Sequence, residues 1–303
     1  MRPTSLRTLL RPWLLAAGLL SAALPASAVV SNPPAPPLLI GVFPTRDFIS
    51  AEGYDDADRV IVKVIHPDGT IRSTDPANPI APSGGIVEVN HPGGACWWTI
   101  TPDVRGFDVV QIDVVSGPNA GRSDAVTVSN MSVRLPVQID ASTVEVYGTA
   151  RNVNNGGQVP LGSLVCRLLS PTGPFERNAR PRIEAPGDGI LRYDGLADFH
   201  WTATFSGLSP ADVENALACE ARVMELIGTT GVIIVERGPA ATGGPMGGCN
   251  APLEELAPLP GSELVPPTTI TDLTGSVSFN NRVTLDWTPS TDNVGVTSYR
   301  VFR

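Results

Sequence analysis

Apolar and polar residues alternate with a period of two along most of the chain, in short runs separated by turn-forming residues. This period is typical of half-buried β-strands and not of α-helices. In the first part, RVIVKVI runs into the turn HPDGT, and GIVEVN runs into HPGG. Further runs follow at 107–115 and 125–133. We therefore predict an all-β domain over residues 38–135, most simply an immunoglobulin-like β-sandwich.

The alternation continues and predicts a second β-sandwich domain over residues 136–237. Its strand candidates are residues 137–150, 163–169, 189–193, 199–205, 221–227 and 232–236. One short helix interrupts these strands, because Ser209 can cap it, Pro210 suits its first turn, and Val213 and Leu217 lie on one face. A helix of about nine residues is too short to be stable alone, so we expect it to pack across the sandwich.

Residues 1–28 have the pattern of a secretory signal peptide. Arg2, Arg7 and Arg11 precede an apolar run that ends at Ala26-Ser27-Ala28. The run is shorter than the about 20 apolar residues of a membrane span, so a cleaved signal is favoured over a membrane anchor. We expect a secreted protein, extracellular or at the cell surface, with no membrane insertion after signal removal. A Pro-rich lead, residues 29–37, follows the signal.

The alternation stops at residue 238, and Gly and Pro become dense up to residue 267. This composition predicts an interdomain linker, extended where Pro is frequent and flexible at GGPMGG. Cys249 lies in it, either exposed or tied back to Cys96.

The sequence after the linker resembles the first half of a fibronectin type III domain. VTLDW at residues 283–287 matches the second strand of that family with its core Trp, and SYRVFR at residues 298–303 matches the third. The loop between them, TPSTDNVGV, resembles that of bacterial members. The resemblance implies an incomplete domain over residues 268–303. It also implies a fragment of a longer modular protein, since bacterial members are commonly repeats or spacers in secreted polysaccharide-degrading enzymes and surface proteins.

Residues 38–237 resemble, more distantly, paired β-domains of secreted actinobacterial proteins of no assigned activity. The segments that carry this likeness are GVFPTRDFISAEGY, VEVNHPGGACW and WTATFSGLSPADVENAL. The resemblance implies no catalytic residue.

The four cysteines, Cys96, Cys166, Cys219 and Cys249, can form disulfides in an exported protein. Cys166 and Cys219 both lie in strand-like runs of the second predicted domain, so we favour a bond between these two. The alternative is four unpaired thiols, some of them buried as small apolar side chains. The sequence has no CxxC, so nothing supports a zinc ribbon or a thioredoxin-type site.

Charge and motifs narrow the classes of function. The net charge of −9 disfavours nucleic-acid partners. The chain has no GxSxG turn and no phosphate-binding GxxxxGK[ST] loop, and His66, His91 and His200 are isolated along the sequence. Acidic residues such as Asp55, Asp56 and Asp58 cluster in one polar loop, where a solvated turn is favoured over a glycosidase pair. We expect no catalytic residue, no metal and no cofactor.

The segment HPGGACWW is the most unusual local feature. Adjacent strand residues point to opposite faces, so Trp97 and Trp98 cannot both enter one core. The outward indole either packs under a neighbouring loop or stays exposed, where it could stack on a sugar ring. His91, Trp97 and Trp98 are therefore the candidate binding residues, with a glycan, the cell wall or a protein as partner.

These observations together predict a secreted, non-catalytic multidomain β-sandwich protein that serves as a binding, adhesion or spacer region. The alternative is the N-terminal accessory region of a secreted glycosidase or another extracellular hydrolase.

Overall fold

The computed structural model describes residues 29–152, 156–171, 173–195, 199–238, 249–256, 268–278, 282–291 and 299 of the 303-residue chain. The predicted signal peptide lies outside the described residues. Within them, strands dominate, in three sheets accompanied by one α-helix. The prediction of an all-β fold is confirmed. No helix of the described part is long and apolar enough to cross a membrane.

A five-stranded sheet lies within the first half of the molecule, residues 29–135. Its order is β1 (Val30–Ser31), β8 (Ser123–Thr127), β7 (Val109–Ser116), β4 (Arg59–Ile65) and β5 (Ile71–Ser73). The β1 strand runs parallel to β8, and the other neighbours are antiparallel. The sequence alternation sets the faces of this sheet: Val110, Ile112 and Val114 of β7 are buried, and the residues between them are partly exposed.

A twelve-stranded sheet runs through the first half and through the second half, residues 136–237. Its path is β10 (Val137–Asp140), β11 (Thr143–Arg151), β15 (His200–Phe205), β14 (Gly189–Tyr193), β13 (Glu176–Arg180), β12 (Leu164–Leu169), β16 (Glu220–Ile227), β17 (Gly231–Arg237), β2 (Leu39–Phe43), β3 (Phe48–Glu52) and β6 (Ile86–Val89). A twelfth strand, β9 (Asn130–Val133), pairs with β11 off this path.

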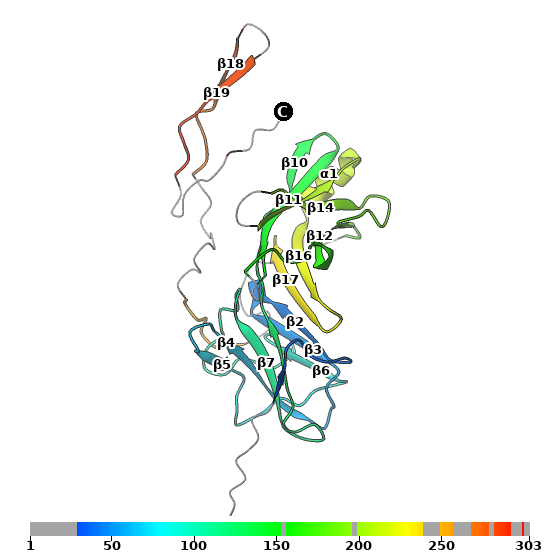
Figure 1. The fold of residues 1–303 in the computed structure, drawn as a ribbon, viewed down its shortest axis with the longest axis vertical. Coiled ribbons are helices and arrows are strands. Elements are labelled where there is room, and N and C mark those ends of the chain that lie inside the picture. The colour runs from blue at the N-terminus through cyan, green and yellow to red at the C-terminus, as the bar shows by residue number, and fades with distance from the viewer. Residues whose placement is uncertain are drawn as a thin grey trace, which may run out of the picture.

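The two halves join where β17 pairs in parallel with β2. Gly231 lies opposite Ile40, and Ile233 lies opposite Val42. Figure 1 shows β16 and β17 in yellow running down to the blue strands β2 and β3 at the middle of the molecule. One sheet therefore contains strands of both halves, although the sequence predicts separate domains that meet at residues 135 and 136. Buried apolar side chains of both sheets and both halves form one cluster.

The run at 125–133, which looks like one strand in the sequence, is two strands. Residues up to Thr127 belong to β8 in the five-stranded sheet, whereas Asn130–Val133 forms β9 in the twelve-stranded sheet. The chain changes sheets at Val128 and Ser129, which are both buried. This crossover is one of the connections between the first half and the second half, because β9 pairs with β11 of the second half.

The predicted helix is α1 (Pro210–Leu217), and it lies against β10 and β11. As expected, Ser209 caps it: the Ser209 hydroxyl accepts a hydrogen bond from Asp212 N at 3.1 Å. Val213 and Ala216 form its buried face. Leu217, which the sequence places on the same face as Val213, is 40% exposed. Two short 3-10 turns are also present, η1 (Pro44–Arg46) and η2 (Leu161–Ser163).

The described C-terminal residues form a hairpin of β18 (Thr274–Ser278) and β19 (Arg282–Asp286), with Val277 opposite Val283. The rings of Trp287 and Tyr299 meet edge to face, with centroids 5.2 Å apart. The remainder of the predicted fibronectin motif, residues 292–298 and 300–303, lies outside the described residues. The fibronectin type III assignment stays a prediction.

Candidate functional site

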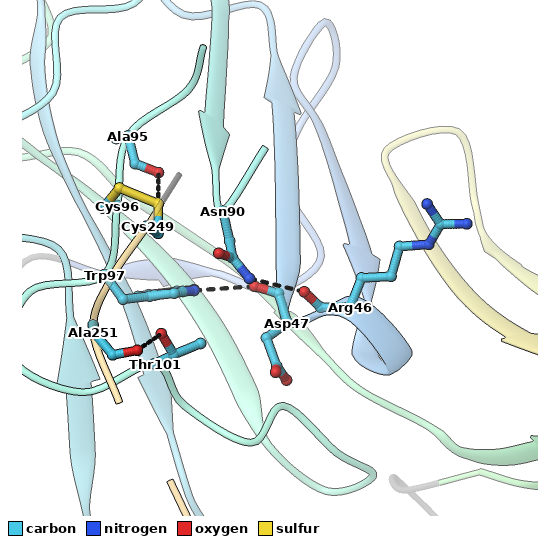
Figure 2. Close-up of a disulfide and its surroundings, with 9 residues drawn as sticks. All are labelled: Arg46, Asp47, Asn90, Ala95, Cys96, Trp97, Thr101, Cys249 and Ala251. Carbon is cyan, nitrogen blue, oxygen red and sulfur yellow. Dashed lines mark hydrogen bonds between the residues drawn. A yellow bond between two sulfur atoms is a disulfide. The ribbon is translucent and has the colours of Figure 1, made fainter. Parts of the chain in front are cut away.

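The two adjacent indoles of the predicted binding segment point to opposite sides, as the alternation predicts. Trp97 is 2% exposed and Trp98 is 51% exposed. The Trp97 indole N–H donates to the carbonyl oxygen of Asp47 at 3.0 Å, as Figure 2 shows. Trp97 is therefore a core residue of the first half. The backbone N–H of Trp98 donates to Ser73 O of β5 at 3.1 Å.

His91 does not join Trp98 in one site. Its ring lies 5.1 Å from the ring of Phe48, and its Nδ1 lies 3.2 Å from Glu88 Oε2. No hydrogen bond or ring contact links His91 to Trp98 in the described part of the chain. Of the three candidate binding residues, Trp98 alone presents a large apolar surface to solvent.

The disulfide of the protein joins Cys96 to Cys249, with their Cα atoms 5.5 Å apart. The prediction of a bond between Cys166 and Cys219 is wrong, and both of these thiols are free and buried. The strand register explains why: Cys166 lies opposite Val223 of β16, four positions along the chain from Cys219. Four residues of strand span about 13 Å, about twice the largest Cα separation that a disulfide allows.

The bond to Cys249 brings part of the predicted linker onto the first half. We call residues 249–256 the strap. Beyond the disulfide, Thr101 N donates to Pro252 O and Glu254 N donates to Thr101 O, both at 2.9 Å. These two bonds form a parallel β-bridge between Thr101 and Leu253. Figure 2 shows the strap passing beside Trp97, with the hydroxyl of Thr101 directed at the carbonyl of Ala251. The strap is thus an ordered part of the first half.

The far end of the strap is held by a buried charge cluster of His66, Arg72, Asp108 and Glu254. His66 lies between two carboxylates, with Nδ1 2.9 Å from Asp108 Oδ1 and Nε2 3.0 Å from Glu254 Oε2. Arg72 of β5 also binds Glu254, with Nε 2.8 Å from Oε1. The hydrogen bond to Asp108 is the main cause of a raised His66 pKa, opposed by burial. We call this group the clasp cluster.

Asp47 lies next to this cluster and carries an unusual pKa. Burial raises its pKa from 3.8 to about 7, opposed by the hydrogen bond from Val104 N and assisted by the negative charges of Asp103, Asp108 and Glu254. Val104 N donates to Asp47 Oδ1 at 2.9 Å. The backbone of Asp47 is left-handed, with φ of 49°. Such a carboxyl can take up a proton near neutral pH.

A second buried charge cluster lies at the junction of the two halves. Arg46 of η1 binds Glu236 of β17, and its Nη2 lies 3.4 Å from Glu220 Oε1 on β16. Arg222 Nε lies 2.7 Å from both Glu220 Oε1 and Glu236 Oε1. Glu236 N also donates to the hydroxyl of Thr45 at 3.0 Å. Residues on both sides of the junction therefore contact one another through charged groups as well as through strand pairing.

A hollow of about 630 Å³ lies near the start of the described chain and is lined by residues that include Ser31, Tyr54, Arg122 and Asp124. Tyr54 packs beneath the Arg122 guanidinium, 5.0 Å from ring to charge, and Arg122 Nε binds Asp124 at 2.9 Å. The side chains of Tyr54, Arg122 and Asp124 thus contact one another at the edge of the hollow.

Sequence reasoning missed both charge clusters. His66, Arg72, Asp108 and Glu254 are far apart in the chain, and none stands in a recognisable motif. One signal was available: Cys249 and Glu254 sit five positions apart in a Gly- and Pro-rich segment, and a cysteine there needs a partner in an exported protein. No group of three or more His, Cys, Asp or Glu side chains in the described ranges is placed to hold a metal ion.

Neither a family model nor a curated protein matches the chain. Among solved structures, one similar chain is a tetra-tandem repeat in the extending region of a large adhesion protein, at 12% identity and a TM-score of 0.21. The alignment covers 66% of this chain and 47% of that one. Another is the purple acid phosphatase PPD1 from yellow lupin (Lupinus luteus) seeds, at 11% identity and a TM-score of 0.22, covering 62% and 36%. Likenesses at these scores assign neither a family nor a function.

Proposed function

We propose that residues 29–256 act as a rigid, non-catalytic spacer in a secreted modular protein, exposed outside the cell. The observation that carries the proposal is the twelve-stranded sheet, whose pairing passes from β17 to β2 without interruption. Two domains on a flexible linker would vary in relative orientation, whereas a shared sheet fixes it, because bending the junction would break backbone hydrogen bonds.

The two charge clusters and the strap support the same role. Arg46, Glu220, Glu236 and Arg222 add side-chain contacts across the junction. The disulfide and the clasp cluster hold the strap against the first half at both of its ends. Exported proteins keep such disulfides. The chain that leaves the strap would then start from a fixed point, which is what a spacer requires.

A distance measurement tests the rigidity. Spin labels would be placed on exposed residues of the two halves with Ser83→Cys and Gln138→Cys, and on one half with Gln138→Cys and Glu214→Cys as the control. Cys166 and Cys219 are buried and burial raises their thiol pKa, so they should not react. A spacer gives a distance distribution between the halves as narrow as that of the control pair. A distribution several times broader would overturn the proposal.

Trp98 supports a second candidate function, contact with a glycan surface. Its indole is half exposed and is anchored by a backbone bond beside β5, and an exposed aromatic ring can stack on a sugar. Ile71 of β5 is also more than half exposed and would extend the apolar surface. This candidate is compatible with the spacer role, and with an accessory region of a secreted hydrolase.

Retention on insoluble polysaccharide and on purified cell wall tests this candidate. Trp98→Ala should reduce retention at least tenfold and leave thermal unfolding unchanged, because the indole is exposed and its backbone bond remains. Ile86→Ala, which truncates another exposed apolar side chain, is the matched control and should bind normally. Equal retention of wild type and Trp98→Ala on every surface would refute the candidate.

A further inference from the structure

The Cys96–Cys249 bond closes a covalent loop that contains the entire second half. The two cysteines are 153 residues apart in the sequence. All of the strands from β7 to β17, and helix α1, lie between them. The strands β1 to β6 precede Cys96. The second half is therefore connected to the rest of the molecule as a branch, although it is a continuous part of the polypeptide.

The chain both enters and leaves through the first half. It enters at β1, which pairs with β8 of the five-stranded sheet. It leaves along the strap, which pairs with Thr101 and binds His66 and Arg72. Figure 1 shows the short orange segment of the strap beside β4 and β5, in the first half and away from α1 and β10.

We propose that the second half is a side module that tension along the chain bypasses. Tension applied between the two ends of the protein reaches Cys96 from the N-terminal side and Cys249 from the C-terminal side. The sulfur–sulfur bond between them then carries this tension. That bond is covalent, whereas the sheets are held by hydrogen bonds and packing. Strands before Cys96 can be drawn out under load, but the residues between the two cysteines cannot be extended while the bond is intact.

The topology also determines what load does to the joint between the halves. Drawing out β2 would remove the partner of one edge of β17, but β17 would keep its full register with β16, from Gly231–Ile227 to Arg237–Ala221. The second half would therefore remain folded while the first half yields. A surface of the second half, such as the end with α1 and β10, would stay available for contact under tension. The availability of this surface under tension matters only if the proposed spacer function holds. The bypass of the second half does not depend on that function.

Stretching single molecules tests the bypass. Handles would be attached before Val29 and after Arg303, and the chain would be extended fully with and without a thiol reductant. Reduction should lengthen the extended oxidised protein in a single step by about 550 Å, the contour of the 153 locked residues. The double variant Cys96→Ser/Cys249→Ser should reach the longer extension without reductant. Equal full extensions of the oxidised wild type and this double variant would overturn the proposal.

Two comparisons sharpen this test. The variant Cys166→Ser/Cys219→Ser should keep the short extension, and the long extension in this variant would also overturn the proposal. If Cys96→Ser/Cys249→Ser fails to fold, the reduction step in single wild-type molecules still decides the outcome, because it needs no variant. The spin-label distances report on rigidity alone, so a broad distribution together with a reduction step would remove the spacer role and leave the bypass intact.

Discussion

At the scale of single residues, Gly148 is the glycine of the described part with the least room for a side chain. It lies in β11 opposite Val133 of β9 on one side and Trp201 of β15 on the other. A Cβ at this position would lie 1.9 Å from Ser132 O and 2.4 Å from Trp201 Cζ2. Both neighbours are held in place, the first by strand pairing and the second by complete burial. The side-by-side pairing of β9, β11 and β15 therefore requires glycine at this position.

We predict that Gly148→Ala lowers the free energy of unfolding by about 3 kcal/mol or more, since overpacking of a rigid site costs about 1–3 kcal/mol and occasionally more. Urea unfolding followed by tryptophan fluorescence would measure the change. Gly162→Ala is the matched control, because nothing lies within 4 Å of a Cβ at Gly162. Its unfolding free energy should change by less than about 1 kcal/mol. A Gly148→Ala protein as stable as Gly162→Ala would contradict the structure.

At the same scale, the opposite directions of Trp97 and Trp98 and the Ser209 cap could be predicted from the sequence, because both depend on local geometry. Alternation along a strand and capping of a first helical turn involve residues one to three positions apart. The structure does not bring His91 next to Trp98, although the sequence grouped them as binding residues. Their relative positions depend on how the HPGG turn directs its side chains. The pairing of Cys166 with Cys219 failed for a similar reason, since the register of β12 with β16 is not visible in composition.

At the scale of elements, the strap and the residues beneath it form a unit that responds to pH. Asp103, Asp108 and Glu254 bring three carboxyl groups near His66, and the charges of the same three act on Asp47; Arg72 and Arg105 balance them in part. Burial raises the pKa of Asp47 to about 7, so its protonated form is favoured in the folded state. Above about pH 4, the usual pKa of Asp, the unfolded chain loses the Asp47 proton while the folded protein keeps it, so the free energy of unfolding falls as pH rises.

We predict that Asp47→Asn stabilises the protein at pH 8. Between about pH 4 and pH 7 the folded wild type binds more protons than the unfolded chain, so the wild-type stability falls as pH rises, by at most about 4 kcal/mol for a shift of this size. Asn cannot ionise, its side-chain oxygen can still accept from Val104 N, and it tolerates the left-handed backbone. Denaturant unfolding of both proteins from pH 4.5 to pH 8 would measure the difference.

The two pH profiles should lie closest together at pH 4.5 and separate progressively up to pH 7. His66 adds a fall common to both proteins: its raised pKa means that its stabilising charge is complete below about pH 6.5 and is lost as pH rises through the folded value. The difference between the profiles therefore isolates Asp47. A variant less stable than the wild type at pH 8 would contradict the burial of an ionisable carboxyl at this position.

At the scale of the whole molecule, the all-β class followed from the sequence, but the continuity of the sheet did not. The alternation indicates strands wherever they occur, and turn residues indicate where they end. The alternation does not indicate which strands become neighbours. The strands β2 and β17 pair, although the strands from β3 to β16 lie between them in the sequence. Parallel pairing of this kind leaves no mark in the loops, because no short turn connects the two strands.

Arg46 is where this long-range joint can be tested, because it is the residue of the first half that neutralises Glu220 and Glu236. Both carboxylates are almost fully buried, and burial raises the pKa of Glu236. We predict that Arg46→Met destabilises the protein by about 3–5 kcal/mol, the usual cost of removing one partner of a buried ion pair. Urea unfolding should also separate into two transitions, because the coupling between the halves weakens.

Two further variants make the cause specific. Adding Glu236→Gln to Arg46→Met should restore part of the lost stability, since Arg222 then has one buried carboxylate to neutralise, that of Glu220, in place of two. Arg180→Met, which breaks the exposed pair of Arg180 with Glu184, is the control and should cost less than about 1 kcal/mol. If Arg46→Met unfolds in one transition at the wild-type urea concentration, the charge cluster does not couple the halves, and the strand pairing between β17 and β2 and the shared apolar cluster must hold them together.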